Sequence, residues 1–204
     1  MVELHLYVEG GGDSKLLRTA GRRGFSEFLA KAGLKGHMPR IVACGGRRQA
    51  YDDFCTALRQ SRHVAMLLVD SEDAVTVPSS WTHLLQRPAD AWPTPPDATD
   101  DDCHLMVQCM ESWLLADRDA LKTFFGQGYD ANALPPEQNS IETIPKIVVY
   151  QALAKATKDC KTKERYGKGE HSFLLLALID PVKVTVASPW ASHFVTVLKK
   201  TMGA

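Results

Sequence analysis

One apolar run constrains the fold of this chain more than any other feature. After His63, every residue of the segment HVAMLLV (63–69) is apolar, and the run ends abruptly in the acidic segment Asp70-Ser71-Glu72-Asp73. A strand without polar and apolar alternation is typical of a parallel sheet that is covered on both faces. We therefore predict that 63–69 is the central strand of an α/β domain.

The flanking sequence alternates between strand-like and helix-like segments. Residues 2–8 (VELHLYV) alternate as a strand does and end in Glu-Gly-Gly-Gly, before a helical pattern over 14–32. A short strand at 40–44 leads through two glycines into a second helix, and a weaker helix is expected over 79–85. A Pro- and Asp-rich loop (87–102) precedes a strand at 105–110 and a helix that begins at 111. This order predicts a mainly parallel four-stranded sheet flanked by helices.

The chain changes character after Phe125. A loop rich in Gly, Pro and Asn extends to about 140, and only helical segments follow, at 145–157, 173–178 and 190–200. We expect 1–125 to form an α/β catalytic core and 126–204 to form a helical extension packed on it. Basic residues gather in the first half of that extension: Lys146, Lys155, Lys158, Lys161, Lys163, Arg165 and Lys168.

Composition limits the kind of protein. Lys and Arg total 24, as do Asp and Glu, so nucleic-acid affinity would come from local patches rather than from a global basic field. The five cysteines form no CxxC pair, and no secretory apolar segment opens the chain. No stretch approaches the roughly 18 to 20 apolar residues of a membrane helix. We expect a cytoplasmic protein that does not bind membranes.

Acidic residues follow two of the predicted strands. Glu9 lies at the end of the first strand, and Asp70 and Glu72 follow the central one. Ligands of open parallel sheets bind at the carboxyl ends of the strands. Three carboxylates at one place repel one another unless a cation neutralises them, and oxygen ligands without His or Cys favour Mg²⁺ or Mn²⁺. The plain alternative is helix capping, above all for Asp13 and Asp73.

Other phosphate-handling motifs do not fit. The segment from Glu9 to Lys15 has neither the GxxxxGK[ST] spacing of a P-loop nor the GxGxxG of a dinucleotide fold. A haloacid-type phosphatase would have Asp-x-Asp after the first strand, where this chain has a single Glu. A receiver domain would have paired acids at that position.

A Glu after the first strand and Asp-x-Asp/Glu after the third resemble the Toprim superfamily of topoisomerases, primases and overcoming-lysogenization-defect nucleases. More narrowly, the chain resembles small Toprim-like proteins of unknown function that accompany phage-defence ATPases. That likeness covers nearly the whole chain. The matching segments are Val8-Glu9-Gly10, Leu68-Val69-Asp70-Ser71-Glu72, Met110-Glu111-Ser112-Trp113-Leu114-Leu115-Ala116-Asp117, Tyr166-Gly167-Lys168, Ile179-Asp180-Pro181 and Ser188-Pro189.

The resemblance implies a Toprim/Rossmann-like fold and a metal site at Glu9, Asp70 and Glu72. Asp13 lies four residues after Glu9 and can join the site. Because the usual motif is Asp-x-Asp, the second ligand is either Glu72 or its neighbour Asp73.

Two further residues are expected outside the metal site. The resemblance implies that Glu111 is an outer carboxylate or a ligand of a second metal, and its alternative is a favourable acid at a helix N-terminus. Lys168 is the candidate for a phosphate contact, with His171 on the following turn, and its alternative is a solvated basic loop. Two arginine pairs, Arg22-Arg23 and Arg47-Arg48, can hold a nucleic-acid backbone or simply lie on the surface.

The expected function is metal-dependent cleavage of phosphodiester bonds in DNA or RNA. As a Toprim-type nuclease, the protein would be the effector of a phage-defence or DNA-repair system, controlled by a partner. The alternative is a non-catalytic Toprim-like subunit that docks to a partner ATPase. A third reading, a small-molecule phosphotransferase, requires a closed pocket near Glu9 instead of an open basic groove.

Overall fold

The structure is a computed structural model that describes residues 3–12, 14–60, 63–169 and 171–204. Within these ranges the strands form one sheet of four parallel strands in the order β2-β1-β3-β4. Their bounds are Leu4–Gly11 (β1), Arg40–Gly45 (β2), Val64–Asp70 (β3) and Cys103–Met106 (β4). The chain order reverses between β1 and β3, which makes the carboxyl ends of these two strands the switch point where ligands bind in such sheets.

Both faces of the sheet are buried, as the apolar run of β3 predicts. Met66 and Leu68 belong to the core on one face, whereas Leu67 and Val69 belong to the core on the other. Successive side chains of a strand point to opposite faces, so a strand that is covered twice must be apolar at every position.

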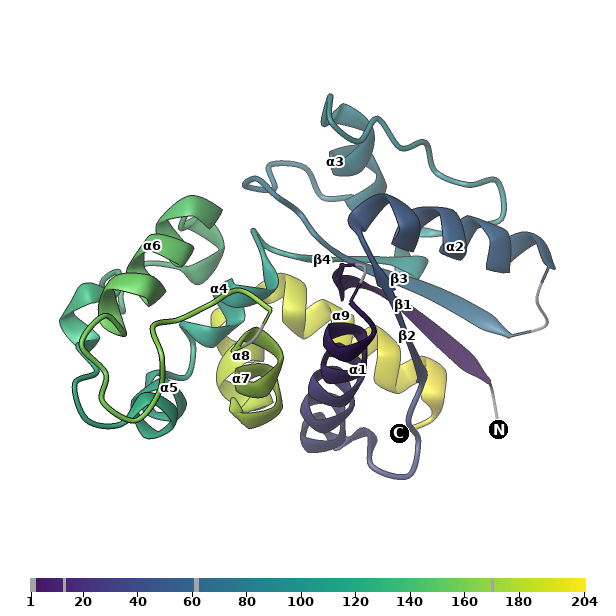
Figure 1. Cartoon of the computed structure of the whole chain (residues 1–204). Coiled ribbons are helices and arrows are strands. Elements are labelled where there is room, and N and C mark those ends of the chain that lie inside the picture. The colour runs from purple at the N-terminus through teal and green to yellow at the C-terminus, as the bar shows by residue number, and fades with distance from the viewer. Residues whose placement is uncertain (1–2, 13, 61–62, 170) are drawn as a thin grey trace.

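Helices form a layer on each side of the sheet (Figure 1). Helices α1 (Lys15–Leu29) and α9 (Pro189–Met202) pack on one face. Helices α2 (Arg47–Gln60) and α3 (Ser80–Gln86) pack on the other. The last helix of the chain is therefore part of the layer that covers the sheet.

The remaining helices lie beside the sheet, on the side of its carboxyl ends. They are α4 (Met110–Leu114), α5 (Arg118–Phe125), α6 (Lys146–Ala156), α7 (Ser172–Leu178) and α8 (Pro181–Ala187). Short segments of π-helix or 3₁₀-helix are Ala30–Leu34, Asp100–Asp102, Ala131–Ala133 and Ile141–Thr143. Helix α7 packs closely on α1 at Gly24, where a Cβ atom would lie 2.7 Å from the carbonyl oxygen of Phe173.

The predicted α/β class, with its parallel four-stranded sheet and helical C-terminal part, is confirmed. One hydrophobic core joins the sheet-side helices to α6 and α7, so a boundary at residue 125 stays a prediction. The strand expected over 105–110 instead ends at Met106, because its partner β3 ends at Asp70, and Met110 already begins a helix. Helix α8 was not expected. It begins with Pro181 and is capped by Asp180, a pattern that the sequence does contain.

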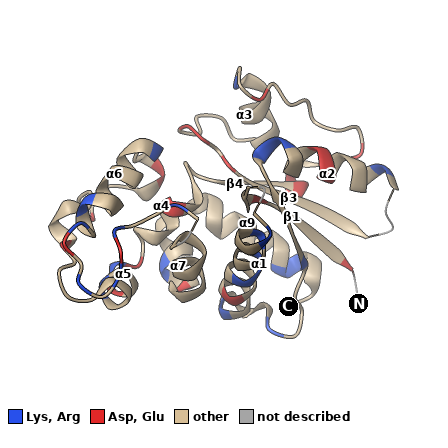
Figure 2. Ribbon diagram, in the orientation of Figure 1, with Lys and Arg blue, Asp and Glu red and all other residues tan. Residues whose placement is uncertain are grey.

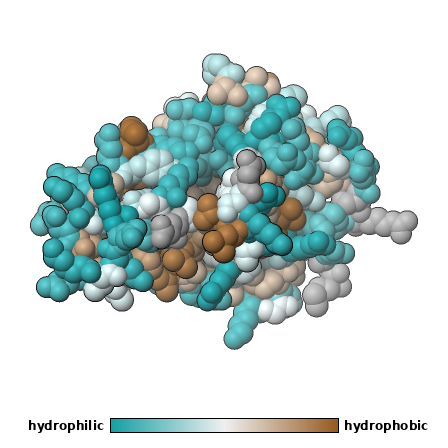
Figure 3. All heavy atoms as spheres, in the orientation of Figure 1, coloured by the Kyte–Doolittle hydropathy of each residue, from teal (hydrophilic) through white to brown (hydrophobic). Residues whose placement is uncertain are grey.

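The face shown in Figure 3 is mostly hydrophilic, with hydrophobic atoms gathered over and between α1 and α7. Leu16, Leu174 and Leu178 are exposed there and line one groove. No helix among the described residues has the length and apolar character needed to cross a membrane.

Candidate functional site

Three carboxylates converge at the switch point of the sheet. Glu9 lies near the end of β1, Asp70 is the last residue of β3, and Glu72 follows it. One ligand oxygen from each of the three lies within 4.8 Å of the others. The convergence follows from topology, because β1 and β3 are adjacent and parallel and so end at the same edge.

Glu9 is held by the neighbouring strand and by α2. Its Oε2 accepts a hydrogen bond from the backbone N–H of Asp70 at 3.2 Å and lies 3.5 Å from Nη1 of Arg47. Burial raises the pKa of Glu9, and the charge of Glu72 raises it further, while Arg47 acts in the opposite direction. The side chain is thus oriented, but its negative charge is only partly balanced.

Asp70 is the most buried of the three, with 5% of its surface exposed. Its Oδ1 accepts from the N–H of Met110, the first residue of α4, at 2.8 Å, and its Oδ2 lies 3.0 Å from Nζ of Lys146. Burial, together with the charges of Glu9 and Glu111, raises the pKa of Asp70 to about 8 despite that lysine. A carboxylate that is costly to ionise here gains most from a nearby cation.

Lys146 bridges two of the carboxylates. This first residue of α6 places its Nζ 2.6 Å from Oε1 of Glu72 as well as 3.0 Å from Asp70, and these two acids raise the pKa of Lys146. The backbone N–H of Glu72 donates to the carbonyl of Gln108 at 2.9 Å, which keeps the segment after β3 beside the segment after β4. An ammonium group therefore already lies against two of the three acids.

Arg47 ties the site to the loop before β4. Its guanidinium contacts Glu9 and the backbone carbonyl of Asp70, binds both oxygens of Asp90 at 2.8 and 2.6 Å, and lies 4.8 Å from the ring centre of Trp92. Such a two-pronged arginine–carboxylate pair fixes orientation as well as charge. We conclude that Arg47 positions Glu9 and is largely buried, which leaves little of it to hold a nucleic-acid backbone.

Of the two candidates for the second ligand, the described residues place Glu72 in the carboxylate group. Asp73 points to solvent, with 69% of its side chain exposed, and binds Arg87 at 2.8 Å. Asp13 lies outside the described residues. The geometry thus separates Glu72 from Asp73, while metal binding by any of these residues stays a prediction.

Glu111 lies close to the three acids but has different partners. It is 2% exposed, its Oε2 accepts from the hydroxyl of Tyr150 at 3.1 Å, and its Oε1 accepts from Tyr166 at 3.3 Å and Ser172 at 3.0 Å. Burial and the charge of Glu111 raise the pKa of both tyrosines, which keeps them protonated as donors. The geometry is therefore compatible with both interpretations of Glu111, as an acid at a helix N-terminus and as an outer member of the site.

Lys168 reaches the same region from the basic loop before α7. Its Nζ lies 5.1 Å from the ring centre of Tyr150, and the next residue, Gly169, donates its N–H to Oγ of Ser172 at 3.0 Å. Glu111 thus holds the loop that carries Lys168 through its hydrogen bonds with Tyr166 and Ser172. His171 is buried, and its Nδ1 accepts from the N–H of Gly167 at 3.1 Å, so it stabilises the loop from inside.

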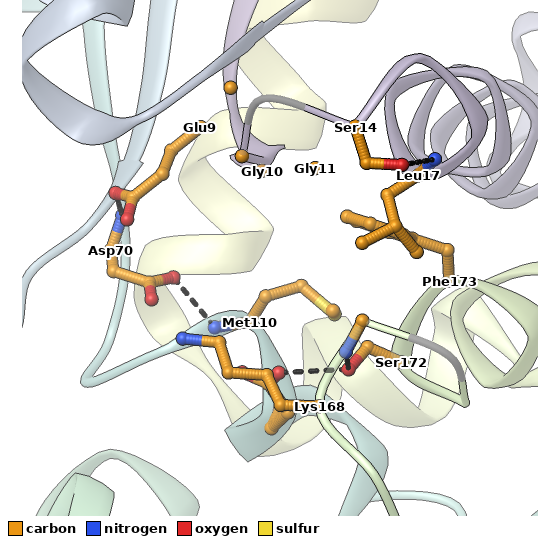
Figure 4. A pocket seen from close by; sticks show the side chains of 14 residues that line it. Glu9, Gly10, Gly11, Ser14, Leu17, Asp70, Met110, Lys168, Ser172 and Phe173 are labelled. Atoms are coloured by element: carbon orange, nitrogen blue, oxygen red, sulfur yellow. Dashed lines mark hydrogen bonds between the residues drawn. The ribbon is translucent and has the colours of Figure 1, made fainter.

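A cavity of about 340 Å³ is lined by Glu9, Asp70, Glu111 and Lys168, among others. Glu9 and Asp70 lie on one side of it, and Leu17 and Phe173 on the other, with Lys168 at a further wall (Figure 4). The glycines after Glu9 form its rim. Gly11 has a φ of +90°, and a Cβ atom there would lie 2.7 Å from the backbone nitrogen of Arg18, so glycine is required for the close approach of this loop to α1.

A family model described as a domain of unknown function, DUF4276, matches residues 8–199. The chain belongs to this family. The match includes the three acids, Lys146, Glu111 and Lys168, and so covers the whole site. No curated protein and no solved structure matches the chain.

The other basic candidates lie apart from these acids. Arg22 donates to Thr19, and Arg48 pairs with Asp52 on the exposed face of α2. Arg23 lines the groove between α1 and α7. Figure 2 shows charged residues on many elements of the ribbon, and the basic residues lie on several helices rather than in one stripe.

Sequence reasoning assigned no role in the site to Lys146, Tyr150 or Ser172. In the sequence Lys146 is one member of a basic run, and its partners Glu72 and Asp70 lie 74 and 76 residues away in the chain. No periodic pattern or spacing reports an ion pair over such a separation. Tyr166 belongs to the segment Tyr166-Gly167-Lys168 of the Toprim-like resemblance, which is the sequence signal for this network.

Proposed function

We propose that this protein is a Mg²⁺- or Mn²⁺-dependent nuclease of the Toprim type that hydrolyses phosphodiester bonds in DNA or RNA. The observation that carries the proposal is the convergence of Glu9, Asp70 and Glu72 at the switch point, with ligand oxygens within 4.8 Å of one another. Three hard oxygen donors, with Asp70 buried and unfavourable to ionise alone, fit a small divalent cation.

Each residue then has a defined task. Glu9, Asp70 and Glu72 hold the cation, and Arg47 and the N–H of Met110 keep two of these acids oriented. A cation bound there supplies a Lewis acid for a phosphoryl oxygen and a water of lowered pKa. Lys168 contacts the phosphate, and Glu111 positions the Lys168 loop. We place the activity in phage defence or DNA repair, under the control of a partner protein, because of the resemblance to Toprim-like proteins.

The test is cleavage by the purified protein with Mn²⁺ of plasmid DNA, single-stranded DNA and tRNA. Asp70→Asn and Glu9→Gln should abolish Mn²⁺-dependent cleavage. Asp73→Asn is the matched control, since it removes a neighbouring exposed charge and should leave cleavage unchanged. Equal cleavage by wild type and Asp70→Asn would refute the assignment.

A second candidate function is a non-catalytic subunit that docks to a partner ATPase. It is supported by the apolar groove between α1 and α7, where Leu16 is 77% exposed and Leu174 and Leu178 are also accessible. Exposed apolar patches often mark protein contacts. This function predicts that Asp70→Asn retains biological activity in cells, whereas Leu16→Glu loses it; the nuclease function predicts that Asp70→Asn is inactive in cells.

A further inference from the structure

The cavity beside the acids has two chemically different ends. Glu9 and Asp70 form its acidic end, next to the proposed cation site, and Leu17, Met110 and Phe173 give it apolar walls (Figure 4). A ligand that fills it must carry a cation-binding group at one end and an apolar, flat or aromatic group at the other. Polar residues that fix orientation within a mainly apolar pocket are typical of sites for small molecules.

The size of the cavity narrows the ligand further. At about 340 Å³ it lies at the lower end of the range of roughly 300 to 1,000 Å³ that holds small molecules. One nucleotide fits such a volume, whereas a base-paired duplex does not. Enzymes that act on a base or nucleotide inside a pocket need it unpaired or turned out of the stack.

The charge of the walls indicates where a phosphate would lie. Glu9, Asp70 and Glu111 would repel it in the absence of a cation, and Lys168 is the basic side chain among the described residues that line the cavity. A phosphate is therefore favoured only together with a bound cation, between the acids and Lys168.

We infer that the cavity receives a single nucleotide unit, with its phosphate at the acidic end and its base against Leu17, Met110 and Phe173. This inference rests on the proposed metal-dependent function and names its substrate class. The unit comes either from a free mononucleotide or from an unpaired nucleotide of a strand. A fully paired duplex interior is excluded as a substrate.

The test fills the cavity without touching the acids. Leu17→Trp occupies the apolar end, and Leu16→Trp is the matched control on the adjacent residue, which is 77% exposed. Calorimetry measures binding of a nucleoside 5′-monophosphate in the presence of Mn²⁺, and Mn²⁺ binding is measured separately by electron paramagnetic resonance. We expect Leu17→Trp to weaken nucleotide binding at least about tenfold and to leave Mn²⁺ binding unchanged, while Leu16→Trp changes neither.

A second variant protects the test against misfolding. Leu17→Glu keeps a side chain of similar volume and places a charge against the apolar end where the base would lie, so it should weaken nucleotide binding as well. Thermal melting confirms that each variant is folded. Cleavage assays with single-stranded DNA and with a fully paired closed duplex then identify the source of the nucleotide unit. If the mononucleotide inhibits single-strand cleavage, the mononucleotide and the DNA strand bind at the same site.

The outcomes separate this inference from the proposed function. If the wild type binds Mn²⁺ but no nucleotide, or if Leu17→Trp binds nucleotide as well as wild type does, the nucleotide cavity is refuted and the metal site stands. Cleavage of the closed duplex at the single-strand rate also refutes it. If the wild type binds no Mn²⁺, the proposed function fails, and this inference fails with it because no metal cation then joins the phosphate to the carboxylates that line the cavity.

Discussion

Two acidic regions share one rim of the sheet and differ in their partners. Glu9, Asp70 and Glu72 face cationic side chains, Arg47 and Lys146. Glu111 instead accepts hydrogen bonds from three neutral hydroxyls. A metal ion that enters the first region exchanges one cation for another, but at Glu111 it would break hydrogen bonds worth about 1 kcal/mol each. Position at the rim alone does not make a carboxylate a metal ligand; its partners decide.

The largest expected difference between the regions is in metal affinity. Asp70→Asn should weaken Mn²⁺ binding more than about 100-fold, because loss of a direct ligand exceeds the 10- to 100-fold effect of residues that merely support ligands. Glu111→Gln should change it less than about threefold. Titration of free Mn²⁺ by electron paramagnetic resonance measures both. Equal losses of Mn²⁺ affinity in the two variants would contradict the distinction between the two acidic regions.

In contrast to metal affinity, the stability of the metal-free protein should depend on Glu111. Glu111→Gln replaces one acceptor oxygen with an amide donor facing a hydroxyl, and we expect the free energy of unfolding to fall by roughly 1.5 to 2 kcal/mol. Urea denaturation of the metal-free protein measures this loss, with the exposed Asp119→Asn as control. An unchanged midpoint for Glu111→Gln would show that the hydroxyl network carries no net stability.

Lys146 provides a sharper test of the first region. If its ammonium group competes with the metal for Asp70 and Glu72, Lys146→Met should bind Mn²⁺ about tenfold more tightly, because an ion pair worth roughly 1.4 kcal/mol no longer has to be displaced. Lys155→Met, on the same helix and exposed, is the control. Weaker binding by Lys146→Met would instead make the lysine a support for the metal site.

Over a single pH unit, the smallest effect is a pH dependence. Since the pKa of Asp70 is raised from an ordinary value of 3.8 to about 8, the metal-free folded protein keeps a proton that the unfolded chain has lost. Its stability therefore falls as pH rises from about 4 towards 8, by about 1 kcal/mol between pH 6.5 and 7.5. Melting curves in buffer without metal test this. Asp70→Asn should have a shallower slope, and saturating Mg²⁺ should flatten the wild-type slope.

The sequence by itself determined the sheet and the location of the acids. The uniformly apolar run that ends in Asp70-Ser71-Glu72 and the alternating strand that ends in Glu9 and three glycines are both local patterns, and the parallel order brings their ends together. It placed the end of β4 four residues too late and passed over α8, because short elements are bounded by contacts and caps more than by periodicity.

Only the tertiary structure decided which carboxylates share partners. The choice of Glu72 over Asp73 depends on a backbone turn at Glu72, whose φ is +68°, and on Arg87 drawing Asp73 outward. Lys146 and Tyr150 reach the acids because α6 packs against α4, a contact between segments more than 30 residues apart that no local pattern encodes. Ion pairs and hydrogen bonds of this kind depend on distances in space, and the sequence states only distances along the chain.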